Sequence, residues 1–159
     1  MRIAIGSDHR GVAARLRLIG LLERMGHEVI DFGTDSEESA DYPLFIWPTA
    51  ESVAKGECDR GIVLGKSGNG EAITANKVKG VRCALCWTVE GARLSRQHND
   101  ANCLSIGQGM VDEDVALAIV RAWLETDFEG GRHQRRIKEI SALENGEDLR
   151  VVQSSLEFD

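Results

Sequence analysis

The sequence lacks any long apolar run and has fewer basic than acidic side chains. No run approaches the roughly 20 apolar residues that a membrane span requires, and the first residues, MRIAIGSDHRG, become polar too early for a signal peptide. Lys and Arg number 19 against 26 Asp and Glu, a formal net charge of -7, which has the wrong sign for a general nucleic-acid binder. We therefore expect a cytoplasmic protein without membrane or nucleic-acid partners, in which any anionic ligand meets a locally basic pocket.

Cysteine is also scarce, and its spacing argues against a metal or redox site. The four cysteines are Cys58, Cys83, Cys86 and Cys103, and the segment CALC matches a C-x-x-C pattern. However, VRCALCW predicts a strand, in which residues three apart point to opposite faces. No second pair exists to complete a zinc site. We therefore expect buried or half-buried thiols and no metal.

Short apolar runs alternate with amphipathic stretches along the whole chain. The runs are residues 2–6, 28–33, 61–65, 81–87 and 103–107. This alternation is typical of parallel strands joined by helices that cover both faces of the sheet. A chain of 159 residues with 42% hydrophobic content suits one domain better than two. We predict a single α/β domain over residues 1–159, a three-layer α/β/α sandwich around a five-stranded, parallel, Rossmann-like sheet.

Helical spacing of apolar residues predicts the main connecting segments. One helix follows the first strand and stops at Gly26. A second spans PLFIWPTAESVAKG, with a kink or a late start because Pro48 would remove an interior hydrogen bond. Further helices are expected after Asp112 and over residues 131–144. The acidic tail, residues 146–159, has no clear period, and we expect it to be mobile.

The stretch GIVLGKSGNGE, residues 61–71, runs from a predicted strand into a glycine-rich loop. Gly65, Lys66 and Ser67 match the end of a Walker A loop, but that loop needs another glycine five residues before Gly65, where this chain has Arg60. The apolar residues in between predict sheet core. The spacing therefore excludes a P-loop, and the glycines do not fit the G-x-G-x-x-G dinucleotide pattern either.

SGNGE instead predicts a helix start preceded by a loop whose backbone N–H groups, residues 65–70, converge on one oxygen. Glu71 falls in the first helical turn beside them. A carboxylate next to fixed N–H donors can remove a proton adjacent to a carbonyl while the donors hold the enolate oxygen. The alternative is that Glu71 only interacts favourably with the helix dipole, and the local sequence leaves both open.

In combination, five motifs are similar to those of a known family. They are IGSDHRG at the start, DYP at 41–43, SGNGEAITANKVKGVR at 67–82, SRQHNDAN at 95–102 and EGGRHQRR at 129–136. On these motifs, residues 1–143 resemble the type B ribose-5-phosphate isomerases and related sugar-phosphate isomerases. The resemblance implies interconversion of ribose 5-phosphate and ribulose 5-phosphate through an enediolate, without metal or organic cofactor, in sites shared between the subunits of a homodimer or homotetramer.

The resemblance also assigns site residues. The family uses either a cysteine at the end of the third strand or a glutamate in the loop as base, and this chain has Gly65 at the first position and Glu71 at the second. The implied catalytic residues are Glu71, His98, Asp8 and Ser67. The implied substrate-binding residues are His9, Tyr42, Gly65, Lys66, Gly68, Asn69, Gly70, Asn99, Arg132 and Arg136.

The resemblance implies four roles for these residues. Asp8 and His98 would open the sugar ring, and Ser67 and the 65–70 amides would bind the reacting oxygens. Tyr42 would line the sugar pocket, and the phosphate would be held by His9, Arg132 and Arg136. His98 and Asn99 would come from the partner subunit. The spacing of Arg132 and Arg136, i and i+4, independently places both guanidinium groups on one helix face, where they can clamp a dianion. A solvated helix face would show the same spacing.

Two positions depart from the family pattern. Lys66 stands where the family commonly has glycine, and Gly109 stands where it commonly has an arginine that binds phosphate. Either the two changes are coupled, so that Lys66 restores the lost charge, or Lys66 points to solvent and the phosphate is held more weakly. Tetrose or hexose phosphates are therefore alternative substrates, and a catalytically weak phosphosugar-binding protein is the alternative function.

Overall fold

Five parallel strands form one sheet, as predicted, and the structure gives their order across the sheet as β2-β1-β3-β5-β4. The computed structural model describes residues 1–36 and 38–155. The strands are β1 (Arg2–Ser7), β2 (Glu28–Asp31), β3 (Arg60–Gly65), β4 (Cys83–Leu85) and β5 (Cys103–Gly107). The strand expected over 81–87 is reduced to three residues because β4 lies at the edge of the sheet and pairs only with β5.

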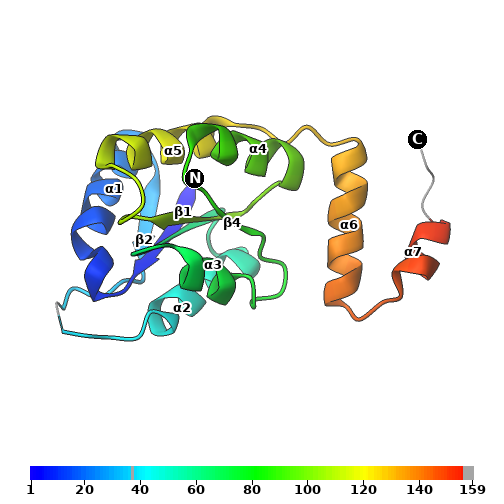
Figure 1. Cartoon of the computed structure of the whole chain (residues 1–159), viewed down its shortest axis with the longest axis horizontal. Helices are drawn as coiled ribbons and strands as arrows, with labels where there is room; N and C mark the ends of the chain where they lie inside the picture. Colours follow the sequence, from blue (N-terminus) through cyan, green and yellow to red (C-terminus); the bar gives the residue numbers. More distant parts are fainter. Residues whose placement is uncertain (37, 156–159) are drawn as a thin grey trace.

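Helices cover both faces of this sheet, which confirms the predicted three-layer sandwich (Figure 1). Side chains alternate along β1, so that Ile3 and Ile5 belong to one apolar cluster and Ala4 belongs to the other. The first face carries α1 (Val12–Arg24), α4 (Val89–Asn99) and α5 (Glu113–Glu125), and the second carries α2 (Pro43–Ala54) and α3 (Asn69–Ala75). Within the described residues, none of the helices is both long and apolar enough to cross a membrane.

Helix α2 begins at Pro43 and continues through Pro48, so the expected late start is wrong. Pro43 occupies the first helical turn, where its missing N–H costs nothing. Pro48 removes the hydrogen bond to the carbonyl of Leu44, but Leu44 is 70% exposed and water can reach that end of the helix. The helix is held by its apolar side, where Ile46 and Ala50 are fully buried.

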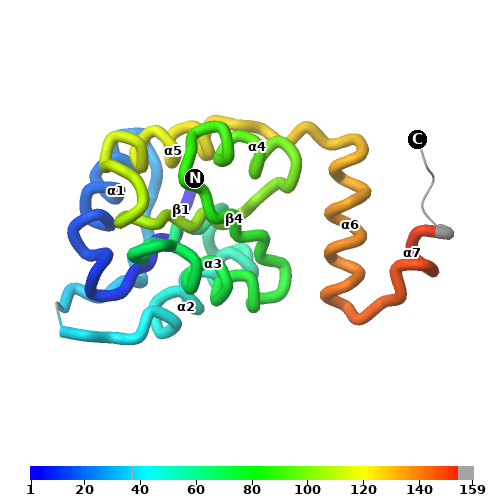
Figure 2. Tube along the Cα trace, in the orientation of Figure 1, coloured from blue at the N-terminus to red at the C-terminus, as the bar shows by residue number. Residues whose placement is uncertain are grey.

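Two C-terminal helices lie beside the sandwich rather than on the sheet (Figure 1). They are α6 (Arg132–Glu144) and α7 (Leu149–Ser155). The tail, residues 146–159, has no clear apolar period and was expected to be mobile, which stays a prediction; residues 149–155 form α7, and residues 156–159 lie outside the described part. Figure 2 shows the chain leaving α5 and passing α4 on its way to α6, and the N–H of Glu129 donates to the carbonyl of Gln97 in α4 at 3.0 Å.

The four thiols are free, three of them buried and Cys83 half-buried, as predicted. Burial raises the pKa of Cys103 to about 12 and raises that of Cys83 well above its usual range. A thiol must lose its proton before it can attack a disulfide or bind a metal. The Cys83–Cys86 pair is therefore chemically quiet in the folded protein.

Arg15 is a buried cation that organises the carboxyl edge of the sheet. Its side chain is fully buried, donates to Ser7 Oγ at 3.1 Å and forms ion pairs with Asp31 at 3.1 Å and Asp35 at 3.0 Å. Gly33 lies against it, since a Cβ at Gly33 would collide with the guanidinium group. Arg15 thereby fixes the end of β1 relative to the chain that follows β2.

Replacing Arg15 by Met, which roughly preserves volume, should lower the free energy of unfolding by about 2–3 kcal/mol, because several charge-assisted hydrogen bonds are lost in a buried site. Urea unfolding measures this change. Arg17→Met is the matched control, since Arg17 is half-exposed and pairs with Glu113 at the surface, where a pair contributes about 1 kcal/mol or less. Equal effects of the two substitutions would contradict the role of Arg15.

Candidate active site

Glu71 is a buried carboxylic acid at the start of α3. It is 6% exposed although it lies in the first helical turn, where a glutamate that served only the helix dipole would face solvent. Its carboxyl group fills the space above Gly65 at the end of β3, because a Cβ on Gly65 would collide with Glu71 Oε1 and Cδ. The side chain therefore points inward, over the carboxyl end of the sheet.

The loop between β3 and α3 exposes backbone donors next to this carboxyl group. Gly68 has φ +80, and a Cβ there would lie 2.9 Å from the amide nitrogen of Gly107, so only glycine fits. Ser105 Oγ donates to the carbonyl of Gly68 at 2.7 Å and fixes the loop from below. Among the hydrogen bonds of residues 1–36 and 38–155, none uses the N–H of Ser67, Gly68 or Gly70 as donor, so these groups can donate to a bound oxygen.

Three further predicted residues surround the loop. The Asp8 side chain accepts from the N–H of Arg10 at 3.0 Å, which holds the turn His9–Gly11 beyond β1. His9 Nδ1 accepts from the N–H of Ala40 at 3.2 Å, and this bond leaves Nε2 as the nitrogen that can donate to a ligand. The Tyr42 ring lies against Gly70, since a Cβ at Gly70 would be 2.7 Å from Tyr42 Oη.

The environment of Glu71 favours the protonated acid more than water does. Burial is the largest cause and raises the pKa of Glu71, and the nearby Asp8 carboxylate raises it further. A carboxyl group with a raised pKa is a stronger base at neutral pH than an ordinary glutamate. The site can therefore take a proton from carbon and return it.

Because the carboxylate form must accept the proton, activity should rise with pH through the raised pKa of Glu71. Asp8→Asn removes one of the two causes of this elevation, so the acidic limb of the kcat/KM profile should shift to lower pH, while burial keeps it above the ordinary glutamate range. Profiles measured between about pH 4 and 8 test this. Glu57→Gln, an equal charge change at an exposed residue before β3, should leave the limb in place. A limb that does not move in Asp8→Asn would contradict the assigned coupling.

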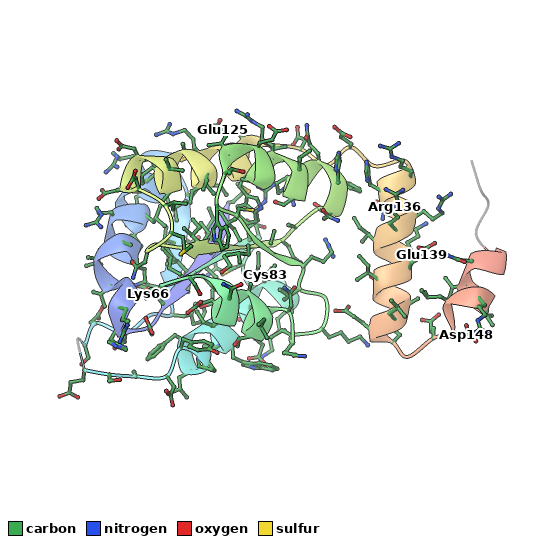
Figure 3. All side chains as sticks on the ribbon, in the orientation of Figure 1. Lys66, Cys83, Glu125, Arg136, Glu139 and Asp148 are labelled. Carbon is green, nitrogen blue, oxygen red and sulfur yellow. The ribbon has the colours of Figure 1, made fainter. Side chains whose placement is uncertain are left out.

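Four predicted site residues are not brought to this loop within one chain. His98 and Asn99 end α4, and Arg132 and Arg136 lie on α6. Figure 3 shows Arg136 on α6, at the other end of the long axis from Lys66. The resemblance places His98 and Asn99 on a partner subunit, and the position of Arg132 and Arg136 on α6 is compatible with the same origin. Their grouping with His9 at the phosphate stays a prediction.

His98 has its own neighbours at the junction of α4 and α6. Its ring stacks on that of His133, with centroids 4.2 Å apart and an angle of 9° between the planes. Oε2 of Glu129 lies 3.9 Å from Nε2 of each ring. Burial is the largest cause that lowers the pKa of His133, followed by the charges of His98 and Arg132. Sequence reasoning missed Glu129 and His133 because neither belongs to a spacing that predicts a contact with His98.

His98, Glu129 and His133 are together candidate ligands for a metal ion. Their ligand atoms lie within 4.8 Å of one another. A metal ion must lie near the plane of each imidazole that binds it, along the nitrogen lone pair. Two nearly parallel, stacked rings have no common point in both planes. The arrangement therefore suits a stacked histidine pair better than a metal centre.

Lys66 lies next to Gly109. Its carbonyl accepts from the N–H of Gly109 at 2.9 Å, and its side chain is exposed. A Cβ placed on Gly109 would lie 3.2 Å from Cγ of Lys66, so the lysine stem lies against the turn after β5.

The fold and this arrangement define a class of α/β proteins that bind a small, oxygen-rich ligand at the carboxyl edge of a doubly wound parallel sheet, beside a buried carboxylic acid and free amides. Comparison with known proteins narrows the class. Residues 3–140 match the family model described as Ribose/Galactose Isomerase. The chain is 45% identical to the ribose-5-phosphate isomerase B of Escherichia coli K12 over 143 residues, which is 90% of this chain and 96% of that protein.

Solved structures agree with this match. The ribose-5-phosphate isomerase B of Clostridium thermocellum is 49% identical, with a TM-score of 0.90 over 92% of this chain and 99% of that one. The Mycoplasma genitalium enzyme, solved with bound ribulose 5-phosphate, is 38% identical, with a TM-score of 0.88 over 91% and 96%. This chain belongs to the ribose/galactose isomerase family.

Proposed function

We propose that this chain interconverts ribose 5-phosphate and ribulose 5-phosphate, with Glu71 as the base. The observation that carries the proposal is the inward-facing Glu71 carboxyl group, packed on Gly65 beside the free amides of the 65–70 loop. The names of the relatives support the choice of a five-carbon phosphosugar. The cytoplasmic location expected from the sequence stays a prediction.

The reaction starts from the open-chain aldose. The Glu71 carboxylate removes the proton from C2, and the electron pair moves through the C1–C2 bond so that negative charge develops on O1. The N–H groups of Ser67, Gly68 and Gly70 donate to that oxygen and stabilise the enediolate. After a proton moves from O2 to O1, Glu71 delivers its proton to C1, which leaves the carbonyl at C2. Neither a metal nor an organic cofactor enters any of these steps.

We also propose that the working enzyme is a homo-oligomer with shared sites. The residues implied for ring opening and phosphate binding at the α4–α6 junction lie away from Glu71 in the same chain, so a second copy would have to supply them. Helix α6 has an apolar side suited to such a contact, since Ile140 is 43% and Leu143 is 56% exposed. The choice between dimer and tetramer is left to measurement of the mass in solution.

The experiment that tests the isomerase is proton exchange in deuterated water. Aldose phosphates of four, five and six carbons are incubated with the protein, and the products are followed by nuclear magnetic resonance. We expect ribose 5-phosphate to give ribulose 5-phosphate with deuterium at C1. Faster turnover of a tetrose or hexose phosphate would reassign the substrate. Binding without deuterium incorporation would instead support the alternative, a phosphosugar-binding protein.

A further inference from the structure

The two positions that depart from the family pattern touch each other. A Cβ placed on Gly109 would lie 3.0 Å from the carbonyl oxygen and 3.2 Å from Cγ of Lys66. A side chain at 109 would therefore press against the backbone and the stem of Lys66. We propose that Lys66 is the residue of the 65–70 loop that binds the substrate phosphate, and that Gly109 is required because it gives the lysine side chain its space.

Lys66 and the histidine that the resemblance assigns to the phosphate follow adjacent strands. Ser7 at the end of β1 pairs with Leu64 in β3. His9 opens the turn after β1, and Lys66 lies in the loop directly after β3. Both residues therefore lie at the same carboxyl edge of the sheet, where a phosphate group would bind.

The turn after β5 supports the same place. The N–H of Gln108 donates to the carbonyl of Gly65 at 2.9 Å, and its side-chain amide donates to the carbonyl of Arg10. These bonds tie the turn that carries Gly109 to both the 65–70 loop and the turn of His9. The turn against which the Lys66 stem packs is thereby in direct contact with the turn of His9.

The charges at this edge leave the Lys66 ammonium available. Its side chain is exposed, and none of the ion pairs within residues 1–36 and 38–155 involves it. By contrast, Arg15 on the same side is held by Asp31 and Asp35. The nearest rival is Arg10, which is exposed in the turn of His9. In a chain with a net charge of -7, a dianion needs such a cation.

This inference rests on the proposed function for the identity of the ligand, but binding tests it without turnover. In a Glu71→Gln background, calorimetry measures the affinity for ribose 5-phosphate and for inorganic phosphate. Lys66→Met should weaken both by about tenfold or more, as for loss of a charged hydrogen bond. Lys77→Met, at an exposed lysine beyond the far end of α3, is the matched control and should change neither affinity.

A second set of variants tests the coupling with Gly109. Gly109→Ala should weaken the binding of both ligands by displacing Lys66. The double variant Lys66→Gly, Gly109→Arg should recover the affinity that Lys66→Gly alone loses, since the arginine replaces the lost cation. Affinities of Lys66→Met within twofold of the parent would overturn the proposal. So would a loss confined to Arg10→Met. A protein that binds ribose 5-phosphate through Lys66 but incorporates no deuterium would refute the isomerase and leave this assignment intact.

Discussion

Replacing Glu71 by Gln should reduce turnover of ribose 5-phosphate by about 10³-fold or more, the upper range for loss of a general base. The amide has nearly the same shape, so it should keep the packing on Gly65 and the position of the 65–70 loop. Binding of the sugar phosphate should therefore change little. Steady-state kinetics and calorimetry on the same preparation measure both quantities.

Turnover and binding, measured on the same preparation, separate loss of the chemical step from loss of substrate binding. Glu57→Gln, at an exposed position before β3, controls for the loss of one negative charge. Retained turnover in Glu71→Gln would remove the base from the mechanism. Loss of both turnover and binding, with an unchanged melting temperature, would show that the carboxylate holds the substrate rather than moving a proton.

Mixing two inactive variants should restore activity if sites are shared. In a mixed dimer of Glu71→Gln and His98→Asn subunits, one site combines the intact Glu71 of one chain with the intact His98 of the other. Random pairing after joint refolding should then recover about one quarter of the parental sites. Each variant refolded alone should stay inactive, and the specific activity of the mixture measures the gain.

The matched control pairs Glu71→Gln with Asp8→Asn. Asp8 and Glu71 lie at the same carboxyl edge of one chain, so no mixed dimer contains a site in which both are intact. This mixture should show only the residual activity of Asp8→Asn. An equal gain in both mixtures, or no gain in the first despite mixed dimers confirmed by mass, would contradict the shared site.

The sequence predicted the fold because its signals are local and repeated. Short apolar runs, most of which end in glycine, predict parallel strands, and each of the five strands overlaps one of those runs, with β1 and β3 one residue longer. The glycine-rich loop could be predicted in the same way, since the strand that ends at Gly65 and the carboxylate at Glu71 are both local features of the sequence. The burial of the Glu71 carboxyl group could not be predicted, because it depends on the missing Cβ of Gly65.

Other features arise only from contacts between distant segments. Arg15 belongs to an otherwise ordinary amphipathic helix, and its burial depends on Asp31 at the end of β2 and Asp35 beyond it. Ser105 is one polar residue inside an apolar strand, and nothing in its neighbourhood predicts a bond to the carbonyl of Gly68. The separation of Arg136 from the loop is likewise invisible in the sequence, since helical spacing gives the face of a helix and not its distance from the sheet.

The packing of Glu71 on Gly65 bears on how the family diverged. A side chain of any size at position 65 would occupy the volume that the Glu71 carboxyl group fills. The cysteine base that the resemblance describes at 65 and a glutamate base folded in from 71 would therefore occupy the same volume, so the two arrangements exclude each other in one chain.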